Sequence, residues 1–381
     1  MISTETTISE CRKAILDYLL ASLGRENIVS VILTGSAARG QERYKSINGI
    51  AVLESDLDLV VVVDDSSILR SLRLIKRISQ DLTAYLRKKW ILSHVSMSVV
   101  TERSITRAQP SIFFHDLSTN GKVLYGKQIN GWLTPYAINQ IPINDICRLL
   151  LNRMTEAIES MIQVKTVEPT DSGWNRVLRT VGKLVFAMIQ ALLIREGRLV
   201  FNGVGVVELQ GEIDKVQSRT RNELPDLLEL YWKLNDQNSS MLGVQDIEKV
   251  WSVVGMKLED ILRELSGKDS ANIMLGECFD IDKFPLRRTK LALVVLIQYF
   301  GIMSIKDLVS AIYYILKNGP DRIYLDLYEL SSMKPSLLLS STSEDYFQLR
   351  QVPENNDFRE LRRWRESFQY CLRVWKVVNG V

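Results

Sequence analysis

The sequence predicts an α+β protein: an α/β-type core with a mixed, twisted sheet over residues 1–130, followed by a mainly α-helical region over residues 131–381. In the first part, short apolar runs typical of strands alternate with segments of helical periodicity, whereas the second part shows helical periodicity almost alone. Pro135 and Pro142 mark the change between the two parts. We expect helices against one face of the sheet, and a further break in the helical region near residues 268–285.

The elements of the first part follow from their apolar periodicity. Apolar residues recur every three or four positions from Ile8 to Leu23, which predicts a helix that stops at Gly24. Asn48-Gly49, between two short segments that contain apolar residues, predicts a hairpin. In chain order we expect a helix over residues 7–23, a strand over 27–34, a hairpin within 41–55, a strand over 57–63, a helix over 68–89, a strand over 90–100, and a helix followed by a strand within 112–126.

The region after Trp132 is predicted to be helical because its apolar residues keep a spacing of three and four through most of its length. The short run Gly203-Val204-Gly205 is too brief for a dinucleotide-binding fingerprint, so we expect a loop there. The helices expected in this region cover residues 143–163, 174–196, 222–238, 245–266, 290–300, 304–317 and 356–378.

The composition is that of an ordinary globular protein, with 46% hydrophobic and 24% charged residues. A net charge of +3 gives no general attraction to nucleic acid or to an anionic membrane. The four cysteines are far apart and fit neither a disulfide framework nor a zinc site, so we expect reduced core thiols. The two histidines, His94 and His115, are expected to be packed or surface residues. The N-terminus is polar, and the longest apolar stretch, Leu291 to Ile305, is too short to span a bilayer. We therefore expect a cytoplasmic protein without a membrane span.

One stretch of the first part has the residues of a binding site. An apolar run ends at Gly35-Ser36, where small residues let the chain turn into a helix start with exposed backbone N–H groups, a shape that suits phosphate. Asp56 and Asp58 stand at the start of the next strand, and residues two apart in a strand share a face. Two such carboxylates facing this turn would repel each other unless a cation lay between them, and Mg²⁺ takes carboxylate and phosphate oxygens together. The plainer alternative is an ordinary turn with two solvated aspartates.

These residues, in this order, resemble the signature of the polymerase-β-like nucleotidyltransferase superfamily. Gly35, Ser36, Asp56 and Asp58 stand at the positions of its Gly-Ser and Asp-x-Asp motifs, and Arg39 stands where many small members carry Arg-Gly. The resemblance implies transfer of a nucleoside monophosphate from a nucleoside triphosphate, with ATP the expected one, to an acceptor hydroxyl, with release of pyrophosphate. It implies that Asp56 and Asp58 bind Mg²⁺ or Mn²⁺ and act in catalysis, and that Gly35, Ser36 and Arg39 bind the nucleotide. For Arg39, a surface salt bridge remains the alternative.

The chain departs from this pattern in two places. The hairpin within residues 41–55 makes the spacer between the two motifs longer than is usual in the superfamily. The resemblance also implies a third carboxylate on the strand over residues 90–100, where Ser96 and Ser98 stand instead; Glu102 or Asp116 would be the substitutes. Residues 112–126 resemble the segment that closes the core in small bacterial and archaeal members.

The missing third carboxylate leaves other functions open. One alternative is a catalytically impaired protein that still binds nucleotides and acts as a regulator. Another is an antitoxin-like nucleotidyltransferase that modifies proteins; its toxin would be another chain, because the helical region has no Arg-x4-His ribonuclease motif. The near-neutral charge makes a small molecule or a protein a better acceptor than nucleic acid. The acceptor and the oligomeric state do not follow from the sequence.

Overall fold

A computed structural model of the chain describes residues 4–47, 50–53, 55–88, 94–129, 132–133, 136–166, 171–201, 206–216, 224–235, 244–266 and 311–313. The chain divides into two compact units, residues 1–140 with 292–309 and residues 141–291 with 310–381. The helices predicted over 290–300 and 356–378 and the break predicted near 268–285 lie outside the described residues, as does most of the helix predicted over 304–317. The predicted domain boundary after residue 130 stays a prediction.

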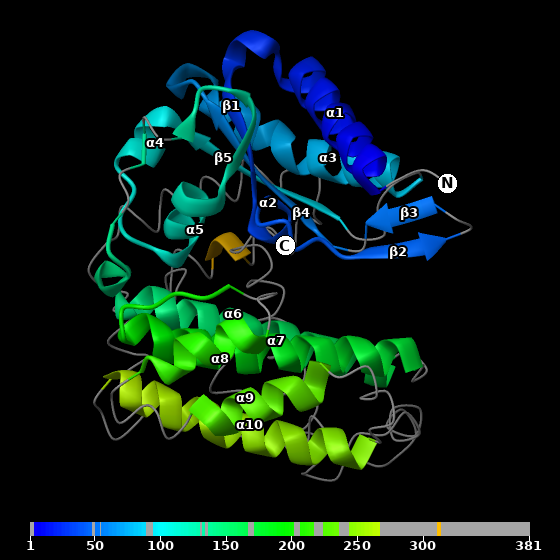
Figure 1. The fold of residues 1–381 in the computed structure, drawn as a ribbon. Helices are drawn as coiled ribbons and strands as arrows, with labels where there is room; N and C mark the ends of the chain where they lie inside the picture. The colour runs from blue at the N-terminus through cyan, green and yellow to red at the C-terminus, as the bar shows by residue number, and fades with distance from the viewer. Residues whose placement is uncertain are drawn as a thin grey trace. The chain divides into compact units, whose positions relative to one another are not determined.

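The first unit is built on a four-stranded sheet in the order β5-β4-β1-β6 (Figure 1). The central strands β1 (Ile28–Thr34) and β4 (Leu57–Val63) are antiparallel. β6 (Lys122–Gly126) is antiparallel to β1, and β5 (Val95–Thr101) is parallel to β4. The predicted fold class is therefore confirmed: a mixed sheet with helices, followed by a helical region.

The other predicted elements of the first unit occur in the predicted order, whereas α4 and the 3₁₀ turns were not predicted. The hairpin predicted around Asn48-Gly49 is present as a separate two-stranded sheet of β2 and β3. Besides the four strands of the main sheet, the unit contains α1 (Thr4–Leu23), the 3₁₀ turn η1 (Arg25–Asn27), α2 (Gly35–Ala38), β2 (Tyr44–Ile47), β3 (Ile50–Leu53), η2 (Asp65–Ser67), α3 (Ile68–Arg87), α4 (Glu102–Thr106), α5 (Ile112–Asn120) and η4 (Ile138–Gln140).

Both faces of the main sheet are covered, and this corrects the expectation of helices against one face only. On one face, alternate residues of β1 and β4 such as Leu33 and Val61 join a buried cluster with α1 and α3. On the other face, Ile32 and Val60 join a second cluster with Ile105 of α4, Leu117 of α5 and the segment after β6. Because β1 and β4 are buried on both sides, they are nearly continuous apolar runs rather than alternating ones.

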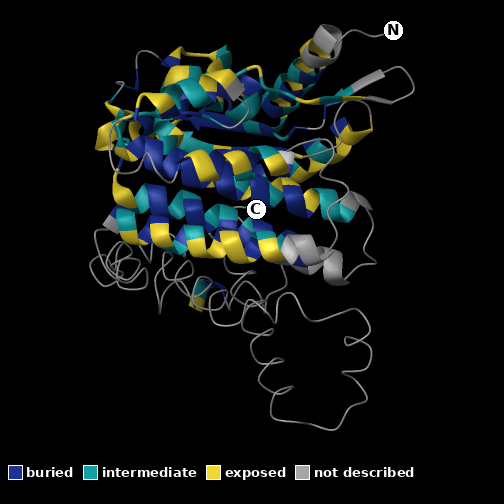
Figure 2. Ribbon diagram, turned by 60° about the horizontal axis from the view of Figure 1, so that its bottom comes forward, coloured by how far each residue is buried: buried dark blue, intermediate teal, exposed yellow. Residues whose placement is uncertain are grey.

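The second unit is helical, as predicted. α7 (Asp171–Arg195) packs against α6 (Ile143–Thr166), α9 (Leu224–Asn235) and α10 (Val244–Ser266). A fifth helix, α8 (Val206–Asp214), was not predicted. Within the described residues, the segment Gly173–Arg195 of α7 is the one helix long and apolar enough to cross a membrane, but 83% of its most apolar window is buried in the structure. Figure 2 shows the buried sides of the described helices, and burial accounts for the apolar composition of α7.

Candidate functional site

The candidate site begins where β1 ends and α2 starts. Gly35 has φ +68°, in the left-handed region that glycine adopts without strain. A Cβ atom on Gly35 would lie 2.4 Å from Oδ2 of Asp58. The carboxylate of Asp58 therefore occupies space that any other residue at position 35 would fill with its own side chain.

The register of the sheet explains why Gly35 and Asp58 meet. In the antiparallel pair of β1 and β4, Asp58 lies opposite Thr34, the residue that precedes Gly35. Its alternate neighbours Val60 and Val62 belong to the cluster on the α4 and α5 side of the sheet. Strand alternation therefore places the Asp58 side chain on that side too. The inserted hairpin forms its own sheet and leaves this register unchanged.

His94 is part of the site, which the sequence did not predict. Nδ1 of His94 lies 3.0 Å from Oδ1 of Asp56, just ahead of β4. The hydrogen bond to Asp56 raises the pKa of His94 above its usual value, and the charges of Asp56 and Asp58 act in the same direction; burial and the charge of Arg87 oppose them. The sequence contained one hint, because His94 alternates with Ser96 and Ser98 and so falls on the same face as these serines, but this alternation does not show which residue His94 contacts.

A third carboxylate is not found beside the aspartates in the described part of the chain. Ser96 is the register partner of Asp58 in β5, so a hydroxyl takes the place that the family resemblance gives to an acid. Glu102 makes an ion pair with Lys127, and Asp116 makes one with Arg39. The two predicted substitutes are therefore both engaged in other ion pairs.

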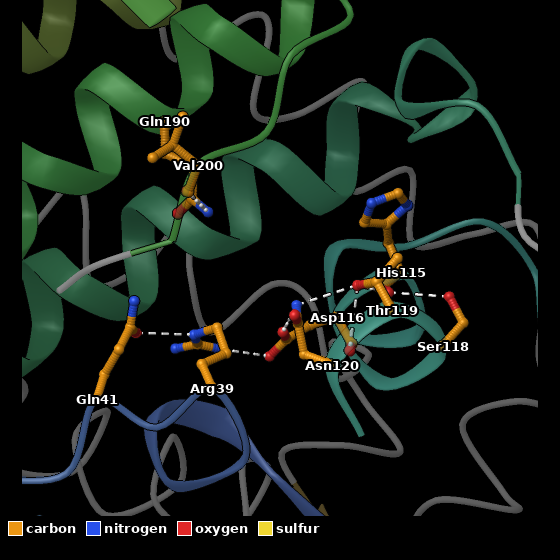
Figure 3. Close-up of polar contacts among 9 residues, drawn as sticks. All are labelled: Arg39, Gln41, His115, Asp116, Ser118, Thr119, Asn120, Gln190 and Val200. Atoms are coloured by element: carbon orange, nitrogen blue, oxygen red, sulfur yellow. Dashed lines mark hydrogen bonds and ion pairs between the residues drawn. The ribbon is translucent and has the colours of Figure 1, made fainter. Parts of the chain in front are cut away.

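Arg39 belongs to a largely buried polar network rather than to a surface salt bridge (Figure 3). Its Nη1 donates to Oδ2 of Asp116 at 2.6 Å, and its Nε donates to Oε1 of Gln41 at 2.9 Å. Nδ2 of Asn120 donates to the other oxygen of Asp116 at 2.9 Å. The side chains of Arg39 and Asp116 are only 14% and 12% exposed. This network joins the end of α2 to α5.

The donor set fits Mg²⁺ or Mn²⁺ held jointly by protein and substrate. In the part of the chain that the structure describes, no three histidine, cysteine or acidic side chains come together in a group that could hold a metal ion. Mg²⁺, however, is commonly bound through one or two carboxylates together with substrate phosphates and water. Asp56 and Asp58 could supply such carboxylates, and Asp58 lies against the Gly35 backbone, beside the glycine–serine turn.

Comparison with known proteins adds a distant structural likeness. No protein-family model matches the chain, and no curated protein sequence matches it. Among solved structures, the chain is similar to spectinomycin adenyltransferase AAD(9) from Enterococcus faecialis, determined with ATP and spectinomycin. The match has a TM-score of 0.36 and 12% sequence identity, and it covers 69% of this chain and 99% of that one. Because this TM-score is low, we infer the function of the chain from its own residues.

Proposed function

We propose that the chain is a metal-dependent nucleotidyltransferase that moves a nucleoside monophosphate from a nucleoside triphosphate, ATP in the first instance, to an acceptor hydroxyl. The observation that supports this most directly is the placement of the Asp58 carboxylate against the Gly35 backbone. Phosphate groups and a carboxylate are both negatively charged, so a site that places them together requires a cation. The proposal therefore includes Mg²⁺ or Mn²⁺ and a triphosphate.

In this function the residues have distinct roles. Asp56 and Asp58 bind the cation, which when bound offsets negative charge on the triphosphate. Gly35 and Ser36 hold the β- and γ-phosphates through backbone N–H groups and a hydroxyl, so that the leaving group is aligned. The oxygen of the acceptor hydroxyl forms a bond to the α-phosphorus and releases its proton to water. The bond from that phosphorus to the bridging oxygen breaks, and pyrophosphate leaves with its electron pair.

For Arg39 we retain the predicted contact with the phosphates, with a condition set by the network described above. The guanidinium already donates to Asp116 and Gln41. A phosphate contact therefore has to be made alongside these bonds or in exchange for the bond to Asp116. As long as the bond to Asp116 is kept, Arg39 also fixes the end of α2 against α5 and so helps to keep the glycine–serine turn in place.

A second candidate is a protein that binds nucleotides in a regulatory role without turning them over. The observation in its favour is Ser96, which lies beside Asp58 in the register of β4 and β5. A serine neither binds a divalent cation nor accepts a proton as well as a carboxylate does. This candidate predicts metal-dependent nucleotide binding without release of pyrophosphate.

The test is incubation with each of the four labelled nucleoside triphosphates and Mg²⁺ or Mn²⁺, with and without cell extract. Asp56→Asn and Asp58→Asn are compared with Asp65→Asn, an exposed aspartate just beyond the other end of β4. We expect the wild type and Asp65→Asn to release pyrophosphate and to label an acceptor. Asp56→Asn and Asp58→Asn should be about 100-fold slower or worse, as when a group that stabilises developing charge is lost. Equal rates for all four proteins would show that the proposed function is wrong.

A small molecule or a protein remains the expected acceptor. The same experiment distinguishes the two, because the label enters either a low-molecular-mass product or a protein band. Label in a protein band would support the protein-modifying alternative. Binding of triphosphate without any labelled product or pyrophosphate would support the regulatory candidate.

A further inference from the structure

The two aspartates of the site are held in different ways. Asp58 is a residue of β4, paired in register with both β1 and β5, and its carboxylate lies against Gly35. Asp56 precedes the first residue of β4, Leu57, and its side chain is 40% exposed. A half-exposed carboxylate outside the strand ladder has rotamer freedom to lose before it can bind a cation.

His94 is placed to restrict that freedom from the neighbouring chain segment. Its backbone carbonyl accepts the N–H of Leu57 at 3.0 Å, so the main chain of His94 is tied to the residue between the two aspartates. Its side chain then reaches Asp56 through Nδ1, 3.0 Å from Oδ1. An ionised carboxylate only accepts hydrogen bonds, so Nδ1 is the donor in this contact.

We propose that His94 is a positioning residue for the cation site: its hydrogen bond from Nδ1 holds the Asp56 carboxylate in the orientation that binds Mg²⁺ or Mn²⁺. This inference rests on the proposed function. It assigns to His94 a role through Asp56, not a contact with substrate or metal. Hydrogen-bond partners behind a metal ligand set its direction, and their loss typically weakens metal binding by 10- to 100-fold.

Side-chain geometry offers a matched pair of variants. The amide nitrogen of asparagine stands at the same position along the side chain as Nδ1 of histidine, so His94→Asn keeps a donor near Oδ1 of Asp56. His94→Leu has similar bulk and no donor. Ser98→Ala is the control at an exposed position of β5, the strand that begins directly after His94. Because the His94 side chain is 51% exposed, we expect all three variants to fold, and thermal unfolding checks this.

The experiment measures Mn²⁺ binding to the full chain by electron paramagnetic resonance, at one fixed pH, with a non-hydrolysable ATP analogue present. We expect His94→Leu to weaken Mn²⁺ binding by about 10-fold, while His94→Asn and Ser98→Ala stay within about threefold of the wild type. Binding of the analogue in the absence of divalent cation should be the same for all four proteins. If His94→Leu unfolds early, His94→Ala replaces it with the same expectation.

The outcomes separate this inference from the function on which it rests. If the wild type and the Asp56→Asn, Asp58→Asn double variant bind Mn²⁺ equally, the proposed cation site is wrong. If the double variant loses Mn²⁺ while His94→Leu binds as the wild type does, the cation site stands and the role of His94 is overturned. Equal losses in His94→Leu and His94→Asn would also overturn it, because the loss would not follow the donor.

Discussion

At Gly35 two physical constraints select the same residue. The backbone has φ +68°, and the nearest atom to a Cβ placed there would be Oδ2 of Asp58 at 2.4 Å. Gly40, five residues later, has φ +73° but no heavy atom within 4 Å of the corresponding Cβ. The two glycines therefore share a backbone conformation and differ in what surrounds them.

Substitution of each glycine by alanine separates these effects. Gly40→Ala should lower the free energy of unfolding by about 1 kcal/mol, the cost of a left-handed conformation for a residue with a Cβ. Gly35→Ala should lower it by about 3 kcal/mol, since the added atom also meets the Asp58 carboxylate. Gly35→Ala should also weaken nucleotide binding, whereas Gly40→Ala should leave nucleotide binding unchanged. Urea unfolding and nucleotide titration measure the two effects, and equal behaviour of the two variants would contradict the close approach of Asp58.

The ion pair of Arg39 and Asp116 is expected to contribute to stability because it is largely buried. Asp116→Ala leaves the Arg39 guanidinium without this partner inside the unit and should cost about 3 kcal/mol in urea unfolding. Glu102→Ala removes one partner of the ion pair between Glu102 and Lys127. Both of these side chains are about half exposed, so the loss in the free energy of unfolding should be less than about 1 kcal/mol. Similar losses in the two variants would show that the Arg39 network is not held as described.

The sequence predicted individual residues where the local pattern was sufficient. Gly35, Asp56 and Asp58 could be chosen as candidate site residues because a turn and a strand start each have a local signature. The partner of Arg39 could not, since Asp116 lies 77 positions away and no local pattern connects the two. His94 was assigned no role because its contact with Asp56 depends on the pairing of two strands, which periodicity does not specify.

At the scale of an element, α3 shows how periodicity determines packing. Ile75, Ile78 and Leu82 are buried in the cluster that α3 forms with the sheet, whereas Leu69 is 60% exposed. We expect Leu82→Ala to cost about 3 kcal/mol, as when a buried leucine leaves a cavity, and Leu69→Ala to change stability by less than about 0.5 kcal/mol. Urea unfolding of both variants is the measurement. A large loss in Leu69→Ala would mean that α3 is rotated about its axis relative to the structure.

Short elements were harder to predict than long ones. The long helices α1, α3, α6 and α7 and the hairpin at Asn48-Gly49 all have several periodic or turn-specific residues. α4 and α5 each provide few apolar side chains to the second face of the sheet, with Ile105 and Leu117 fully buried. α4 has a single buried residue, which gives no periodic signal, and it was not predicted. α5 was predicted within residues 112–126, but a short helix does not indicate which face of the sheet it covers, and this is why helices were expected on one face only.

At the scale of the whole molecule, the charge balance bears on the class of acceptor. With a net charge of +3, the chain has no excess of cations for many simultaneous phosphate contacts. We expect weak binding to single-stranded and double-stranded oligonucleotides, with a shallow dependence of affinity on salt. Fluorescence anisotropy at low and moderate salt tests this. A steep loss of tight binding as salt increases would instead favour a nucleic acid as acceptor.

The pairing of Thr34 with Asp58 has a consequence for how this chain tolerates insertions and deletions. The hairpin of β2 and β3 between the two motifs is not part of the main sheet. Its length therefore does not set the distance from Gly35 to Asp58, which the pairing of β1 with β4 determines. Residues added at the turn of this hairpin should leave the placement of Asp58 against Gly35 unchanged. One residue removed from β4 after Asp58 would reverse the alternation between Asp58 and the valines that follow it. Either those valines would exchange faces of the sheet, or the Asp58 carboxylate would turn toward the buried cluster with α1 and α3.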